Sequence, residues 1–104
     1  AISYLKSFSG DDTMISPAIV GLIGDCYVNM GNVKEGVSYF EKAAKAADNE
    51  VVSPIYLKKA GLAYENLKEY GKAVEAYKRI KEQYYNSMEA SDIDKYITRA
   101  AAAK

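Results

Sequence analysis

Apolar residues recur every three to four positions along two stretches of the chain, one from Val33 to Ala47 and one from Tyr70 to Ile80. The apolar positions are Val33, Val37, Phe40, Ala43, Ala44 and Ala47 in the first stretch, and Tyr70, Ala73, Val74, Tyr77 and Ile80 in the second. This spacing places each set on one face of an α-helix. The pattern therefore predicts two amphipathic helices.

Each of these helices is preceded by another helix, whose start is marked by a Ser-Pro pair. Ser16 and Ser53 suit the N-cap position, where a hydroxyl accepts a hydrogen bond from free backbone N–H groups, and the prolines that follow suit the first helical turn. We therefore expect a helix to begin just after each serine. Gly31 can adopt the left-handed conformation that ends a helix, whereas Lys68, at the matching place in the second copy, is a weaker stop.

The two helix pairs are copies of one unit. A shift of 37 residues aligns Ser16 with Ser53, Gly24 with Gly61, Tyr27 with Tyr64, Asn29 with Asn66, Gly36 with Ala73 and Phe40 with Tyr77. Gly24, Gly36 and Gly61 fall inside the expected helices, where glycine costs about 1 kcal/mol relative to alanine. Such positions indicate that two helices approach each other closely there.

The order of residues within each unit matches a known pattern. The first unit reads Val20, Ile23, Gly24, Tyr27, Gly36, Phe40 and Ala43, and the second reads Leu57, Ala60, Gly61, Tyr64, Ala73, Tyr77 and Ile80. This resembles the tetratricopeptide repeat (TPR) signature: a large residue, Leu-Gly, Tyr, Ala, an aromatic residue and Ala. The resemblance implies an all-α fold, an α-α superhelix of antiparallel helix hairpins.

The resemblance covers nearly the whole chain as a single TPR-like domain. Residues 16–49 and 53–86 correspond to two complete repeats, and residues 91–103 to a C-terminal capping helix. Residues 1–10 match the second helix of a truncated repeat, so about two and a half repeats are expected. Because the chain would then open in the middle of a repeat, we expect it to be a fragment of a longer bacterial TPR protein.

The resemblance also implies a concave groove, lined by the first helix of each repeat, that receives a peptide or a partner's helix. Carried over by position, the candidate groove residues are Asp25, Val28, Asn29, Lys58, Leu62, Glu65 and Asn66, together with Ala18, Gly21 and Ile55. Asn29 and Asn66 recur at one position, and paired amides can hold a peptide backbone by donating and accepting together. Alternatively, both asparagines simply favour a helix C-terminus. An acid at Asp25 would repel a partner's C-terminal carboxylate.

The composition narrows the possible functions. The formal net charge is zero, which gives no general attraction to nucleic acid or to an anionic membrane. The chain has no histidine and a single cysteine, Cys26, so it lacks the commonest general base and the commonest metal ligands. No stretch approaches the ~20 apolar residues of a membrane span. We therefore expect a non-enzymatic protein with no metal and no cofactor, and no contact with nucleic acid or membrane.

Two further clusters are ambiguous. Tyr84, Tyr85 and Met88 precede the last expected helix and suit either a contact surface or packing beneath that helix. The basic run Lys78, Arg79 and Lys81 is flanked by acidic residues within helical reach. That pattern favours a solvent-exposed helix face that carries ion pairs over a phosphate-binding stripe.

The sequence thus predicts a non-catalytic protein–protein interaction scaffold that binds a peptide or partner helix in its groove. The alternative is a structural module that self-associates, as part of a longer solenoid or as a homodimer through exposed repeat ends. Residues 93–97 also resemble the last helix of bacterial TPR proteins that carry one N-terminal membrane anchor. That resemblance favours the periplasmic side of a membrane over the cytoplasm.

Overall fold

A computed structural model describes residues 16–103 of the chain, and the helix expected over residues 1–10 lies outside them. The described part is helical throughout and contains no strand. Its helices are α2 (Pro17–Asn29), α3 (Val33–Ala47), α4 (Ser53–Asn66), α5 (Tyr70–Gln83) and α6 (Ile93–Ala103), with a short 3-10 turn, η1 (Glu89–Asp92), before α6. The expected all-α fold is therefore confirmed.

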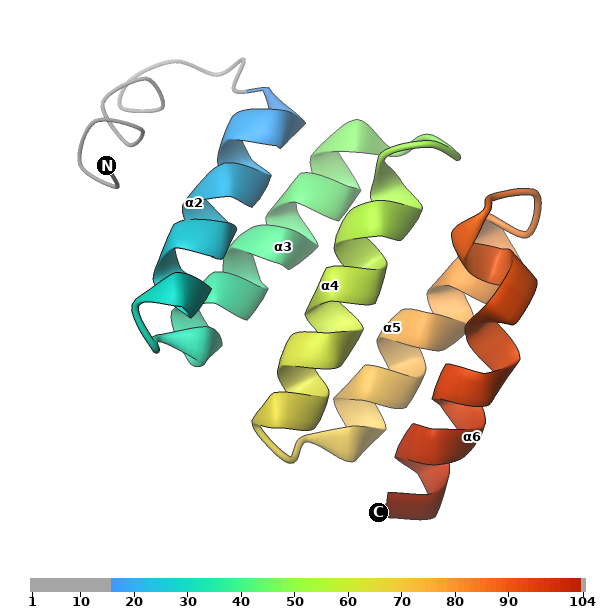
Figure 1. The fold of residues 1–104 in the computed structure, drawn as a ribbon. Coiled ribbons are helices and arrows are strands. Elements are labelled where there is room, and N and C mark those ends of the chain that lie inside the picture. Colours follow the sequence, from blue (N-terminus) through green and yellow to red (C-terminus); the bar gives the residue numbers. More distant parts are fainter. Residues whose placement is uncertain (1–15, 104) are drawn as a thin grey trace.

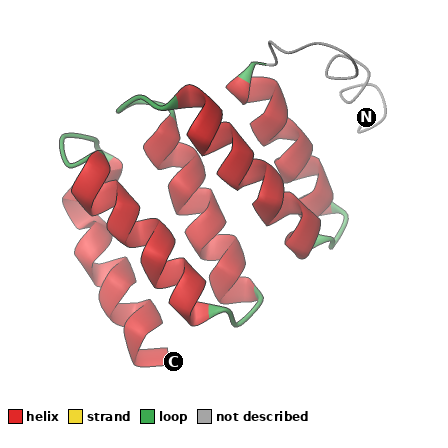
Figure 2. Cartoon of the chain, turned by 180° about the vertical axis from the view of Figure 1, so that it is seen from behind, coloured by secondary structure: helices red, strands yellow, loops and turns green. Residues whose placement is uncertain are grey.

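Each helix packs mainly against its neighbours in sequence, so that the helices form a row of antiparallel hairpins. Helices α2, α4 and α6 lie in the nearer layer in Figure 1, with α3 and α5 behind them. The view from behind shows α3 and α5 in front (Figure 2). The first helices of the two hairpins thus share one face of the molecule with α6.

The start of α2 follows the expected capping, whereas the start of α4 does not. The hydroxyl of Ser16 accepts a hydrogen bond from the backbone N–H of Ala18 at 3.2 Å, as an N-cap residue should. The prediction for Ser53 is wrong. This residue is fully buried as the first residue of α4, and its hydroxyl donates to the carbonyl oxygen of Ala44 at 2.7 Å. The hydroxyl therefore satisfies the C-terminal end of α3 instead of the start of α4.

Asn49 caps the α3–α4 turn in place of Ser53. Its side-chain oxygen accepts from the backbone N–H groups of Val51 at 3.0 Å and Val52 at 2.8 Å. Its own backbone N–H donates to the hydroxyl of Ser53 at 3.0 Å. The turn between the two hairpins is consequently held by local hydrogen bonds.

Helices α2 and α4 end in the same backbone geometry. Gly31 has φ of 85° and Lys68 has φ of 62°, both in the left-handed region. In each case the backbone N–H of this residue donates to the carbonyl oxygen three residues earlier. The backbone N–H of the next residue donates to the carbonyl oxygen of Tyr27 or Tyr64 at 2.8 Å. These bonds define a Schellman motif. The expected stop at Gly31 is confirmed, and Lys68 makes the same stop without the conformational freedom of glycine.

The glycines inside the helices mark close crossings, as predicted. A Cβ added to Gly36 would lie 2.8 Å from the carbonyl oxygen of Gly24, which is closer than real Cβ contacts come. A Cβ on Gly61 would lie 2.3 Å from the ring of Tyr77. Within each hairpin, the two helices therefore cross at the glycine positions, where the absence of a side chain allows a close approach.

Two apolar clusters form the core. One joins α3, α4, α5 and α6 through Ala44, Leu57, Ala73, Tyr77, Ile80, Tyr84, Ile93 and Ala100. The other joins α3 and α4 through Val37, Phe40, Ala60 and Ala63. The second cluster matters for function, because two of its members reach the surface pocket described next.

Candidate partner-binding groove

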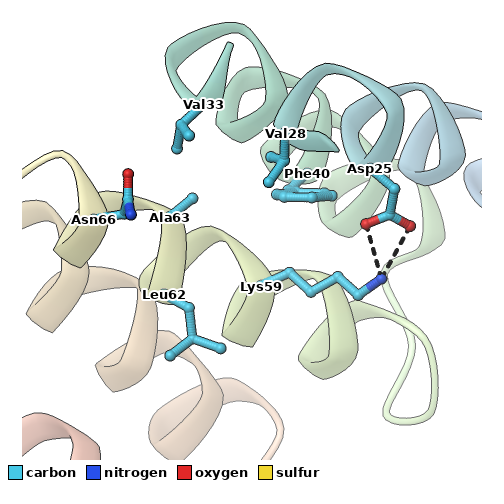
Figure 3. A pocket seen from close by; sticks show the side chains of 8 residues that line it. All are labelled: Asp25, Val28, Val33, Phe40, Lys59, Leu62, Ala63 and Asn66. Carbon is cyan, nitrogen blue, oxygen red and sulfur yellow. Dashed lines mark hydrogen bonds and ion pairs between the residues drawn. The ribbon is translucent and has the colours of Figure 1, made fainter. Parts of the chain in front are cut away.

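A pocket of about 310 Å³ opens where α2 and α3 meet α4. We call it the groove pocket. It is lined by Asp25 and Val28 from α2, Val33 and Phe40 from α3, and Lys59, Leu62, Ala63 and Asn66 from α4. Figure 3 shows the side chains from α2 and α3 on one side of the junction between the two hairpins and those from α4 on the other, with the side chain of Leu62 pointing away from Phe40 in this view.

The floor of the groove pocket is apolar and well supported. Phe40 and Ala63 are buried members of the second core cluster. The ring of Phe40 stacks against that of Tyr56, with 6.4 Å between the ring centroids. Leu62 stands at the edge with 43 % of its surface exposed. The pocket therefore combines a buried apolar base with an exposed apolar side chain that a ligand could cover.

One end of the groove pocket is closed by an ion pair between α2 and α4. The ammonium group of Lys59 lies 3.1 Å from both carboxylate oxygens of Asp25 (Figure 3). The same ammonium lies 5.8 Å from the ring centroid of Phe40. Both charged side chains are partly exposed, so this pair contributes only about 0.2–1 kcal/mol to stability. Its main consequence is that the charge of Asp25 is balanced inside the site.

The other end of the groove pocket carries the amide of Asn66. This side chain is exposed and forms no hydrogen bond with any other residue in the range 16–103. Its repeat equivalent, Asn29, is also exposed but does not line the pocket. Of the two amides expected to act together, the structure places one at the pocket.

Lys58 and Glu65 lie away from the groove pocket, against α6. Glu65 accepts hydrogen bonds from the hydroxyl of Tyr77 at 2.6 Å and from Arg99, whose Nη2 is 2.6 Å and Nε 3.0 Å away. The Arg99 guanidinium holds the pKa of the Glu65 carboxyl below its usual range. Lys58 sits over the ring of Tyr96, 4.6 Å from its centroid. Both side chains therefore contact α6 and help to hold it against α4.

The remaining groove candidates divide among three environments. Gly21 is covered by the ring of Tyr56, and a Cβ there would lie 2.1 Å from that ring. Ala18 is exposed on α2 and does not line the groove pocket. Ile55 borders a separate pocket at the turns of the molecule.

Sequence reasoning did not single out Val33, Phe40, Lys59 and Ala63 as lining residues. Phe40 was identified only as a core position of the repeat signature, and a side chain can serve the core and a pocket floor together. Lys59 had no signal at all, because its partner Asp25 is 34 positions away on another helix. Such a contact follows from how two repeats stack, which the spacing within one repeat does not encode.

The described part of the chain offers no group of three or more His, Cys, Asp or Glu residues arranged to hold a metal ion. None of its helices is long and apolar enough to cross a membrane.

Comparison with known families agrees with the fold. One tetratricopeptide repeat model matches residues 18–50, and a second matches residues 57–87. The chain therefore belongs to the tetratricopeptide repeat family. Domains of this family generally serve as protein–protein interaction modules and are typically non-catalytic. No match to a curated protein or to a solved structure was found.

Proposed function

We propose that this chain is a non-catalytic interaction module that binds a peptide or helix of another protein in the groove pocket. The partner inserts an apolar side chain between Val28, Phe40 and Leu62, and its backbone lies against the amide of Asn66. The observation that carries this proposal is the apolar pocket between the two hairpins, with one unpaired amide at its edge.

The shape of the groove pocket supports this mode of binding. Its volume of about 310 Å³ lies at the lower end of the range typical of ligand pockets, which suits a side chain better than a large cofactor. Binding energy at interfaces concentrates where an apolar anchor enters a preformed pocket. Because Phe40 and Ala63 belong to the core, the pocket exists before a partner arrives, and binding does not have to order its floor.

The chemistry of the lining residues supports a non-catalytic role. The only titratable groups in the lining are the carboxylate of Asp25 and the ammonium of Lys59, and they are paired with each other. Nucleophilic catalysis needs a hydroxyl, thiol or amine activated by a neighbouring base. The lining holds no serine, threonine or cysteine, and its one amine, on Lys59, is engaged in the ion pair with Asp25.

The test is a peptide selection with two matched variants. A random peptide library is panned against the immobilised chain, and selected peptides are titrated by fluorescence anisotropy. Leu62→Glu should weaken binding by about tenfold or more, because it puts a charge over the apolar pocket. The control is Leu22→Glu, since Leu22 is a leucine of α2 with similar exposure, 47 %, that does not line the pocket.

The proposal predicts that only one of the two variants loses peptide binding. Loss of binding in Leu62→Glu alone supports the proposal. Equal loss in both variants, or none in Leu62→Glu, contradicts it. Light scattering of the free chain addresses the alternative, since a mass that rises with concentration would favour self-association.

A further inference from the structure

A second pocket lies at the turns, away from the groove pocket. It has a volume of about 300 Å³, and we call it the turn pocket. Its lining comes from the α3–α4 turn and the start of α4 (Glu50, Val51 and Ile55), and from the turn that follows α5 and the start of η1 (Asn86, Ser87, Met88 and Glu89). Figure 1 shows both turns at the same end of the molecule.

The turn pocket is bordered by the most exposed large apolar side chains of the described residues. Met88 is 87 % exposed and Val51 is 72 % exposed, and Ile55 beside them is also exposed. Full burial of a side chain of this size is worth about 1.5–3 kcal/mol. A partner that covered these side chains would recover part of that free energy.

The α3–α4 turn presents Val51 in a fixed way. The side chain of Asn49 accepts hydrogen bonds from the backbone of Val51 and Val52, and its amide donates to the carbonyl oxygen of Ala47 at 3.2 Å. Ser53 ties the same turn to Ala44. Val51 is therefore exposed on a turn that several local hydrogen bonds hold.

The turn that carries Met88 is fixed in the same manner. The hydroxyl of Ser87 donates to the carbonyl oxygen of Tyr84 at 2.7 Å, and the hydroxyl of Ser91 donates to the carbonyl oxygen of Met88 at 2.7 Å. The hydroxyl of Tyr84 donates to a carboxylate oxygen of Asp48 at 2.9 Å. Because Asp48 closes α3, this last bond ties the two turns together.

The charge around the turn pocket is negative and unbalanced. Glu50 and Glu89 belong to its lining, which contains no lysine or arginine. Within residues 16–103, neither glutamate takes part in an ion pair. The groove pocket differs in this respect, since its carboxylate is already neutralised by Lys59. A ligand of the turn pocket would meet two carboxylates with no competing cation.

We propose that the turn pocket docks a segment of another protein in which an apolar side chain is flanked by lysine or arginine. The apolar side chain packs against Val51, Ile55 and Met88, while the flanking cations pair with Glu50 and Glu89. The flexible thioether of Met88 can adapt to side chains of different shape. This surface is separate from the groove pocket and does not depend on it, so one chain can hold two segments.

The test uses designed peptides and the isotope-labelled chain in solution. The probe is a short acetylated peptide with a central leucine flanked on each side by two lysines. One matched peptide carries glutamates in place of the lysines, and another carries serine in place of the leucine. Amide shifts in ¹H–¹⁵N spectra should gather at residues 50–55 and 86–89 with the lysine–leucine peptide and be absent or much smaller with the other two.

Variants then separate the two parts of the site. The double variant Glu50→Gln/Glu89→Gln should weaken binding of the lysine–leucine peptide by about fivefold, and Met88→Ser should weaken it to a similar extent. Met30→Ser is the control, because Met30 is also well exposed, at 64 %, but lies at the end of α2. Circular dichroism confirms that each variant folds.

Several outcomes would overturn the proposal. One is equal binding of the serine or glutamate peptide, and another is equal loss of binding in Met30→Ser. Shifts confined to the groove pocket would place the peptide there instead. Shifts at residues 50–55 and 86–89 that grow with protein concentration in the absence of peptide would identify the occupant as a second copy of the chain.

Discussion

Gly31 and Lys68 occupy equivalent places in the two repeats, and both adopt a left-handed backbone with the same pair of closing hydrogen bonds. For glycine this conformation is free of steric cost, whereas a residue with a Cβ loses about 1–2 kcal/mol there. The exposed side chain of Lys68 forms no ion pair with any residue the structure describes, so no ion pair offsets that cost.

The substitution Lys68→Gly should therefore stabilise the fold. We expect the free energy of unfolding to rise by about 0.5–1 kcal/mol, because the relief of strain exceeds the larger backbone entropy that glycine brings to the unfolded state. Urea unfolding followed by circular dichroism measures this difference. Lys68→Ala is the matched control and should give little change. An equal gain in both variants would show that removing the lysine charge is responsible.

The contact between Glu65 and Arg99 leads to a prediction about acid stability. Arg99 lowers the pKa of the Glu65 carboxyl in the folded state relative to the unfolded chain. A lowered pKa contributes stability above the unfolded pKa, and that contribution is lost as the pH falls through the folded value. Glu65→Gln should cost about 1–2 kcal/mol near pH 7, and this cost should shrink as the pH is lowered towards 3.

The measurement is urea unfolding of the original chain and of Glu65→Gln across that pH range. Asp94→Asn provides the comparison, because the ion pair of Asp94 with Lys81 is largely exposed and should contribute little at any pH. A constant difference between Glu65→Gln and the original chain from pH 7 to pH 3 would contradict the role assigned to the charged contact.

The close crossing of α4 and α5 can be tested at Gly61. Helix propensity alone favours alanine over glycine by about 1 kcal/mol. The ring of Tyr77 stands where the new methyl group would lie, however, and Tyr77 is fully buried. Gly61→Ala should therefore destabilise the fold by about 1–3 kcal/mol through overpacking.

Repeating Gly61→Ala in a chain with a smaller residue at position 77 shows whether Tyr77 causes the destabilisation. In chains that carry Tyr77→Leu, the added methyl group meets a smaller side chain, so the cost of Gly61→Ala should be reduced. Such a double-mutant cycle isolates the interaction between the two positions. Thermal unfolding of all four chains gives the required values. Independent, additive effects would argue against a direct clash.

The sequence predicted those features that depend on residues close together in the chain. The hairpins followed from apolar spacing, and the stop at Gly31 and the crossing at Gly24 followed from single glycines. The cap expected at Ser53 does not form, because the side chain of Asn49, four residues earlier, accepts from the backbone N–H groups there and the serine hydroxyl donates to Ala44 instead.

The contacts between repeats could not be predicted from residues that are close together in the chain. Glu65 lies at an expected groove position of the second repeat, yet it is held by Arg99, which lies 34 residues further along the chain on α6. The pairing of Asp25 with Lys59 also spans 34 positions. Both depend on how one helix pair is rotated against the next, and that rotation results from side-chain packing across the whole row.

Asn29 and Asn66 allow the proposed groove to be tested with an internal control. They hold the same position in successive repeats and both are exposed, but only Asn66 lines the groove pocket. For a peptide selected by the groove, Asn66→Ala should weaken binding about threefold to tenfold, the equivalent of one or two neutral hydrogen bonds. Asn29→Ala should leave the dissociation constant unchanged. Anisotropy titrations compare the two variants directly. If both substitutions weakened binding equally, the amides would act together along the face of α2 and α4, and the site would have to extend beyond the pocket; if neither did, the peptide would be held by its side chain alone.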